Sequence, residues 1–205
     1  MFGYFLRGLI LGLPAAATPG PFQAYLLSQT LKNGWRHTLP AALAPLLSDG
    51  PIVALVLLIL TQMPPALLAI LKIAGSLFIL YLAWGAFHSV RQERPLRVAA
   101  EEAARQSLIE ATFMNLLNPN PHIFWSTVGG PILLEGWRQA SGHGIAFLLG
   151  FYGTLIGGFV AFILLFGVAG RLGARVNRAL LGISAFALLL FGLYQLWQGL
   201  REIAG

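Results

Sequence analysis

Long apolar stretches separated by short polar turns constrain this chain more than any other feature. Hydrophobic residues make up 57% of its 205 residues and charged residues only 10%, whereas an ordinary soluble domain has about 25% charged residues. A soluble fold of this size keeps roughly 30% of its unfolded-chain surface in water, too much to cover with so few polar residues. The pattern predicts an all-α polytopic membrane protein and excludes a soluble enzyme, a disordered chain and a fibrous protein.

Six segments are long enough to cross a bilayer, which takes about 20 residues of helix. The first and fourth are longer and carry a pair of prolines near the middle, so we expect these two transmembrane helices to be broken. The chain is predicted to form one transmembrane domain, with a first half at about 1–90, a cytoplasmic linker at about 91–107 and a second half at about 108–205. The six predicted spans are about 3–31, 38–61, 66–88, 108–134, 143–169 and 178–200.

Most basic residues lie on one side of this six-span arrangement. Nine of the thirteen Lys and Arg residues fall in loops 1–2, 3–4 and 5–6, three fall on the opposite side, and Lys72 lies within a span. Because cytoplasmic loops are rich in Lys and Arg, these loops are predicted to be cytoplasmic and both termini to lie outside. The net charge of +6 is then a topology signal, and no nucleic-acid partner is expected. The nine residues are Lys32, Arg36, Arg91, Arg94, Arg97, Arg105, Arg171, Arg175 and Arg178.

The two halves of the chain share motifs in the same order. Three matches at similar offsets make chance an insufficient explanation, even in a sequence rich in glycine. Each half has three predicted spans, an odd number, so the second half would enter the membrane from the opposite side. This predicts an inverted-topology repeat, a common construction in secondary transporters. The matching pairs are Thr18–Pro21 with Asn118–Pro121, Gly34–Arg36 with Gly136–Arg138, and Gly75 and Gly85 with Gly182 and Gly192.

The duplicated proline pairs predict new half-helices that start in mid-membrane. Thr18 precedes Pro19 and Asn118 precedes Pro119; Thr and Asn favour the N-cap position, and Pro favours the first helical position. Broken backbone inside a bilayer is tolerated where it lines a cavity or is buried in protein. The free N–H groups at each start could then hold an anionic group such as a carboxylate. The alternative is that the prolines only kink two long helices for packing.

Asp49 is the most informative polar residue, because it lies near the middle of the second span. An ionised Asp at that depth costs roughly 2.5–3.5 kcal/mol, so such residues usually face a cavity and carry protons or cations. We expect Asp49 to couple transport to protons, with a buried Asp satisfied by Lys72 or by neighbouring polar groups as the alternative. Lys72 is expected to extend to the outer interface, to pair with Asp49 or to contact a substrate carboxylate. The predicted substrate-binding residues are Thr18, Pro19, Gly20, Pro21, Gln23, Asn115, Asn118, Pro119, Asn120, His122 and Tyr152, the last standing opposite Asp49 in the repeat alignment.

An ordered set of short motifs covers nearly the whole chain. They are Thr18-Pro19-Gly20-Pro21, Ser28-Gln29-Thr30 through Gly34, Asp49, Lys72–Gly75 running to Tyr81–Gly85, and Phe113-Met114-Asn115 to Asn118-Pro119. In this order and spacing they resemble the LysE/RhtB family of amino-acid exporters, the LysE-type translocators. The resemblance implies a small transporter of the bacterial cytoplasmic (inner) membrane that exports amino acids or related metabolites in exchange for protons or another cation.

Other classes fit the sequence less well. A metal-cation exporter would need several acidic, His or Met ligands inside the membrane, but Asp49 is the one deep acid and the chain has no cysteine. An intramembrane enzyme would need paired acids or a nucleophile with its base, and a structural or assembly protein leaves the capped breaks unexplained. The prediction is therefore a secondary transporter working by alternating access, not an enzyme, with no cofactor or metal. Its partners would be the lipid bilayer, a small-molecule substrate and a proton or other cation, and a homodimer is left open.

Overall fold

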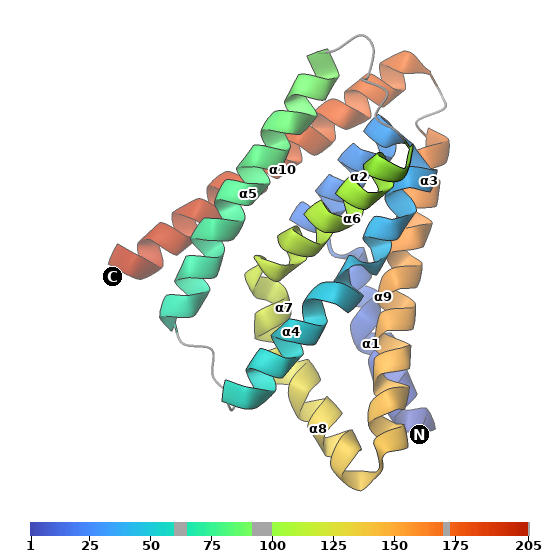
Figure 1. The fold of residues 1–205 in the computed structure, drawn as a ribbon, viewed down its shortest axis with the longest axis vertical. Helices are drawn as coiled ribbons and strands as arrows, with labels where there is room; N and C mark the ends of the chain where they lie inside the picture. Colours follow the sequence, from blue (N-terminus) through green and yellow to red (C-terminus); the bar gives the residue numbers. More distant parts are fainter. Residues whose placement is uncertain (60–64, 92–99, 170–172, 205) are drawn as a thin grey trace.

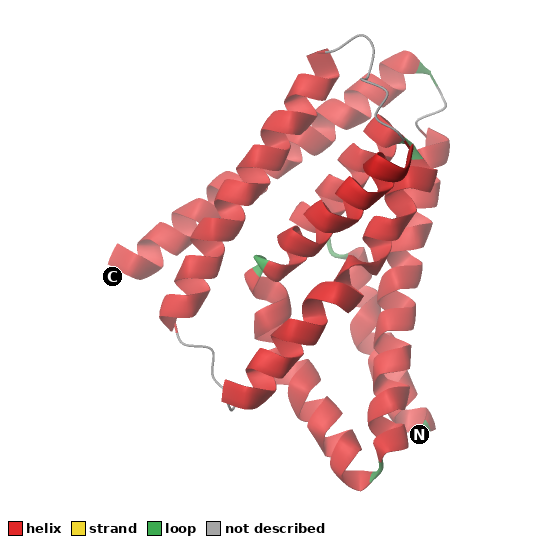
Figure 2. Cartoon of the chain, in the orientation of Figure 1, coloured by secondary structure: helices red, strands yellow, loops and turns green. Residues whose placement is uncertain are grey.

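The computed structural model describes residues 1–59, 65–91, 100–169 and 173–204. Figure 2 shows that nearly all of this part is helical, and it contains no strand. The elements in chain order are α1 (Phe2–Ala17), α2 (Pro21–Asn33), α3 (Trp35–Thr38), the 3₁₀ turn η1 (Leu39–Leu43), α4 (Ala44–Ile59), α5 (Pro65–Arg91), α6 (Ala100–Leu116), α7 (Pro119–Phe124), the π-helical turn η2 (Trp125–Gly129), α8 (Gly130–Gln139), α9 (Ser141–Ala169) and α10 (Ala174–Ala204).

Three of the described helices are long and apolar enough to cross a membrane. These spans are Ala69–Val90 in α5, Ser141–Ala169, and Arg175–Glu202 in α10. Large apolar side chains such as Leu149 and Leu165 are more than half exposed on α9, as expected where a surface faces lipid. The chain is therefore a helical membrane protein.

The other three predicted spans are divided into shorter helices. The first span consists of α1 and α2, and the fourth of α6, α7, η2 and α8. Both helices are therefore interrupted at the predicted proline pairs. The second span, predicted as one helix over 38–61, instead consists of the last residue of α3, the 3₁₀ turn η1 and α4. Its predicted last two residues lie outside the described part of the chain.

Helix α6 starts earlier than predicted. It begins at Ala100, so residues 100–107 of the predicted linker are helical, while residues 92–99 lie outside the described residues. Glu101 and Glu102 stand in its first turn, where negative charge is stabilised by the helix dipole. The polar composition that suggested a linker is thus the amphipathic first half of a helix.

Two helix pairs form the frame around the centre. Helices α5 and α10 run side by side, and α1 packs against α9 (Figure 1). The second contact depends on glycine: a Cβ atom on Gly150 would meet the carbonyl oxygen of Phe5, and one on Gly12 would lie 2.6 Å from the carbonyl oxygen of Phe151. Small residues permit such close approach between membrane helices. Helices α4 and α6 contact each other in the middle of the molecule.

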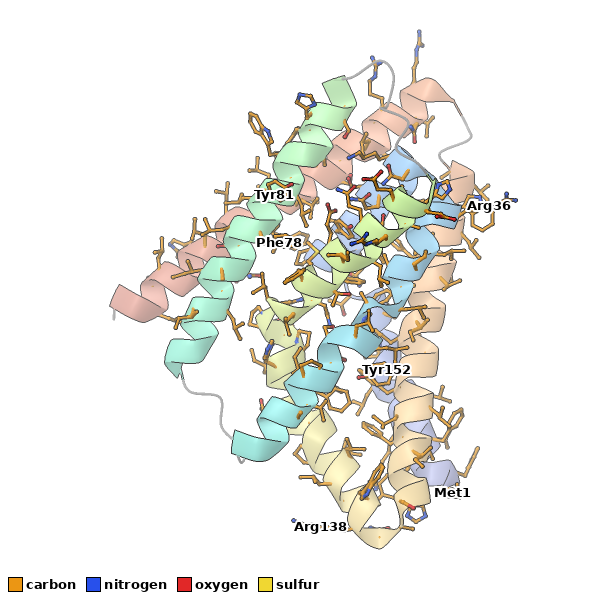
Figure 3. All side chains as sticks on the ribbon, viewed as in Figure 1. Met1, Arg36, Phe78, Tyr81, Arg138 and Tyr152 are labelled. Carbon is orange, nitrogen blue, oxygen red and sulfur yellow. The ribbon has the colours of Figure 1, made fainter. Side chains whose placement is uncertain are left out.

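The basic ends of the helices gather at one end of the molecule. The end of α2 and the starts of α6 and α10 lie together, opposite the α8–α9 turn (Figure 1). Arg36 and Arg138, which the repeat alignment pairs, lie at opposite ends (Figure 3). At the basic end the chain turns sharply at Gly34, whose φ of +86° belongs to the left-handed region that favours glycine.

Candidate functional site

A cavity of about 290 Å³ lies where α1 gives way to α2 and α6 gives way to α7, with α4 and α9 completing its wall. The polar lining residues come from the two breaks and from α4. The apolar lining residues include Phe22, Phe124, Phe151, Leu155 and Phe159. The predicted site residues that line the cavity are Thr18, Pro19, Gly20, Pro21, Gln23, Asp49, Asn115, Asn118 and Asn120.

Asp49 is a buried residue in the lining of this cavity and accepts three hydrogen bonds. Its Oδ1 accepts from Asn115 Nδ2 at 2.9 Å, and its Oδ2 accepts from Trp125 Nε1 at 3.1 Å and from the Tyr152 hydroxyl at 3.0 Å. An ionised carboxylate only accepts hydrogen bonds, so three donors suit its charged form. The alternative in which Lys72 pairs with Asp49 is wrong, because Lys72 pairs with Glu202; uncharged donors surround the carboxylate instead.

Tyr152 reaches the site through Asp49 and does not line the cavity. The repeat alignment places Tyr152 opposite Asp49, and the two side chains meet directly between α4 and α9. Figure 3 labels Tyr152 at this central position. In this structure the Tyr152 hydroxyl donates to the carboxylate, and its contact with the substrate stays a prediction.

Trp125 is a site residue that the sequence reasoning missed. Its side chain is fully buried and its indole N–H donates to Asp49. A buried Trp usually finds a partner for its N–H, so a Trp placed seven residues after Asn118 in the fourth span was an available signal.

The first break leaves free backbone donors at the cavity. Thr18 was predicted to cap the new helix, but its hydroxyl donates backward to the Pro14 carbonyl at 2.6 Å and ends α1. The N-cap of α2 is Gly20, which has no side chain to cap with. Among the described residues, no acceptor meets the backbone N–H groups of Phe22 and Gln23. This end of α2 can therefore bind an anion.

The second break has no such free donors in its first turn. Asn118 is the N-cap of α7, as predicted, and its side chain accepts the backbone N–H of Asn120 at 3.0 Å. Pro119 and Pro121 have no N–H to offer. The buried His122 ring lies with Nδ1 2.9 Å from the Asn118 carbonyl oxygen, and neither His122 nor Pro119 lines the cavity.

Lys72 lies away from the cavity. It stands on α5, where its ammonium pairs with Glu202 of α10, and its backbone carbonyl accepts from Gln195 Nε2 at 3.2 Å. Because α5 packs along α10, the side chain meets α10 instead of α4. In the described part of the chain, no three His, Asp or Glu side chains come together as a metal site would require.

A helical membrane protein with an internal cavity built at broken helices has the architecture of a membrane transporter. The LysE type translocator family matches residues 13–199, and the chain belongs to this family. Its members are transporters, so the chain is not an enzyme.

The curated relatives carry names of efflux proteins. The putative amino acid efflux protein YcgF of Bacillus subtilis (strain 168) is 26% identical over 98% of this chain and 99% of its own length. The arginine exporter protein ArgO of Escherichia coli (strain K12) is 28% identical over 76% of this chain and 78% of its own length. The protein of the same name from Shigella flexneri has the same identity and coverage. No solved structure matches the chain.

Proposed function

We propose that this protein exports amino acids or related small carboxylate-bearing metabolites across the bacterial cytoplasmic membrane. The names of its relatives support the substrate class. The observation that carries the proposal is the pairing, in one cavity, of the uncapped start of α2 with the buried carboxylate of Asp49. An α-amino acid has a carboxylate for the first group and an ammonium for the second.

The cavity suggests how the substrate is held. The substrate carboxylate accepts hydrogen bonds from the backbone N–H groups of Phe22 and Gln23, and its ammonium faces Asp49. Its side chain packs on the apolar wall formed by residues such as Phe151 and Phe159. Asp49 is the charged side chain of this lining, so a zwitterion leaves neither charge without a partner, which matters where water is scarce.

Asp49 would also couple export to the proton gradient. In its ionised form it binds the substrate ammonium, and protonation removes that attraction. In the proposed orientation, with the basic ends of the helices in the cytoplasm and both termini outside, a proton arriving from outside displaces the substrate there. Loss of the proton to the cytoplasm restores the binding form. Such a cycle is antiport by alternating access around one cavity, in an inverted repeat.

A transport screen tests the proposal. Cells that express the protein are challenged with toxic amino acids and amino-acid analogues, and any hit is followed by counterflow in proteoliposomes with and without a proton gradient. We expect at least one α-amino acid to exchange, at a rate that depends on the gradient. Absence of counterflow for every standard L-amino acid would overturn amino-acid export, and exchange that ignores the gradient would overturn proton coupling.

A further inference from the structure

A second cavity, of about 420 Å³, lies between α2, α5 and α6 toward the basic end of the molecule. It shares no lining residue with the Asp49 cavity. Its wall combines charged, amide and aromatic side chains. The lining residues that carry the argument are Tyr25, Gln29, Lys32, Tyr81, Trp84 and Glu110.

Glu110 is held in one position on this wall by three donors. Its Oε2 accepts from the Tyr25 hydroxyl at 2.9 Å and from Gln29 Nε2 at 3.1 Å, and its Oε1 accepts from Gln106 Nε2 at 2.7 Å. Tyr25 and Gln29 are buried, so the carboxylate is anchored to the packed face of α2. Among the described residues no cation lies within ion-pair distance of Glu110. Its carboxylate is therefore fixed in place and is not paired with a cation of the described residues.

Lys32 supplies the opposite charge to the same cavity. It follows Gln29 by three residues on α2, which places both on one face of the helix. Its side chain is exposed and forms no ion pair with a described acidic residue. Tyr81 and Trp84 of α5 add aromatic surface, which attracts ammonium groups and apolar side chains alike. A carboxylate from α6 and an ammonium from α2 in one cavity complement a zwitterion.

The two cavities are stacked along the same two helices. On α6, Glu110 of the second cavity precedes Asn115 of the first by five residues, which is about 7.5 Å along a helix. On α2, Tyr25 of the second cavity follows Phe22 of the first by three residues. A small molecule bound at Glu110 is thus about one turn and a half from the Asp49 cavity.

We propose that the second cavity is a separate amino-acid-binding site, in which Glu110 holds the ligand ammonium and Lys32 its carboxylate. It receives substrate from the cytoplasmic side before the substrate reaches Asp49. The identity of the ligand as an amino acid rests on the proposed function. The rival explanation is that Glu110 only ties α6 to α2 through Tyr25 and Gln29.

The absence of cysteine from the chain makes the proposal directly testable. Ser89 lines the second cavity on α5, so a Ser89→Cys variant of the full chain carries a single thiol there. The rate of its reaction with a maleimide is measured in nanodiscs, alone and with each standard L-amino acid except cysteine, whose own thiol would consume the reagent. We expect at least one amino acid, at a saturating concentration, to slow labelling about tenfold. Ser141→Cys, near the α8–α9 turn, is the matched control and should show no protection.

Second substitutions separate this site from the first cavity. Protection should persist in S89C/D49N, because Asp49 is not part of the site, and disappear in S89C/E110Q. Lys32 is exposed and can change without unfolding the protein; S89C/K32Q should lose protection by the amino acid but keep protection by its amide, which lacks the carboxylate. An unchanged labelling rate without ligand shows that each variant is folded.

The outcomes distinguish the two proposals. Protection of Ser89→Cys without counterflow of any amino acid would keep the second site and overturn export. Counterflow without protection by any amino acid would keep export and overturn the second site. Protection that survives both Glu110→Gln and Lys32→Gln, or that disappears with Asp49→Asn, would also overturn it.

Discussion

The two helix breaks have related sequences and different chemistry. Between α1 and α2 the chain runs through residues 18–20, and α2 starts uncapped at Pro21; between α6 and α7 only residues 117 and 118 intervene, and Asn118 caps the new helix. A proline pair therefore determines that a helix stops and restarts. The side chain at the N-cap determines whether the restart keeps its N–H groups for itself or leaves them for a ligand.

This difference between the two breaks would favour one orientation of a bound substrate. One end of the cavity has free N–H donors at α2, and the other has the Asp49 carboxylate surrounded by groups from α6, η2 and α9. Two equivalent anion-binding starts, as a symmetric repeat would suggest, would leave a substrate free to bind in either sense. A single free start and a single carboxylate favour one orientation of an amino acid.

Replacement of Asp49 should have the largest effect, because it removes the carboxylate proposed to bind the substrate ammonium, while the free N–H groups at the start of α2 remain. We expect Asp49→Asn to lower substrate affinity at least about 30-fold, for a loss of about 2 kcal/mol when one partner of a buried charge pair is removed. Counterflow in proteoliposomes measures it. Glu135→Gln, in an exposed ion pair with Arg7, is the control and should transport normally. Export by Asp49→Asn with its pH dependence intact would contradict the coupling role.

Replacement of Trp125 tests whether this side chain holds Asp49 in place or contacts the substrate directly. Trp125→Phe keeps an aromatic ring but removes the indole N–H from Asp49, and a hydrogen bond to a charged group contributes about 1.5–3 kcal/mol. We expect a lower thermal midpoint in detergent and weaker substrate binding together. Trp197→Phe, on the exposed face of α10, is the matched control. A variant that loses transport at unchanged stability would argue for direct contact between Trp125 and the substrate.

A cap added to the first break should make it resemble the second. Gly20 is extended, with φ −162°, and a Cβ atom there would meet only ordinary contacts, so Gly20→Asn fits and offers a side-chain acceptor to the N–H groups of α2. We expect only a few tenths of a kcal/mol of added stability, because Gly is itself a tolerated N-cap residue, and about tenfold weaker transport. Gly20→Ala, without an acceptor, should keep transport near that of the unchanged protein. Normal transport by Gly20→Asn would show that the start of α2 does not bind the substrate.

The sequence predicted the helical membrane fold, the location of both breaks and the central place of Asp49. It could not predict that α2 starts without a side-chain cap. The Thr18 hydroxyl can donate to a carbonyl of the preceding helix as well as accept from a backbone N–H of the following one, and here it does the former. It also could not predict the partner of Lys72, since Glu202 lies 130 residues away and meets it through helix packing. The Glu110 cavity could not be predicted for the same reason: its lining residues come from three helices that meet only through packing.

Removal of the cap at the second break should have the smallest effect, and on stability more than on transport. Asn118→Ala frees the backbone N–H of Asn120, so we expect a loss of about 1 kcal/mol, seen as a thermal midpoint lower by about 2–4 °C. Transport should change little, because Pro119 and Pro121 still leave α7 with one free donor at most in its first turn. Asn118→Asp keeps an acceptor and should restore the midpoint. If Asn118→Ala instead weakened substrate binding as strongly as Gly20→Asn, both breaks would contact the substrate, and the single orientation favoured for the substrate would be wrong.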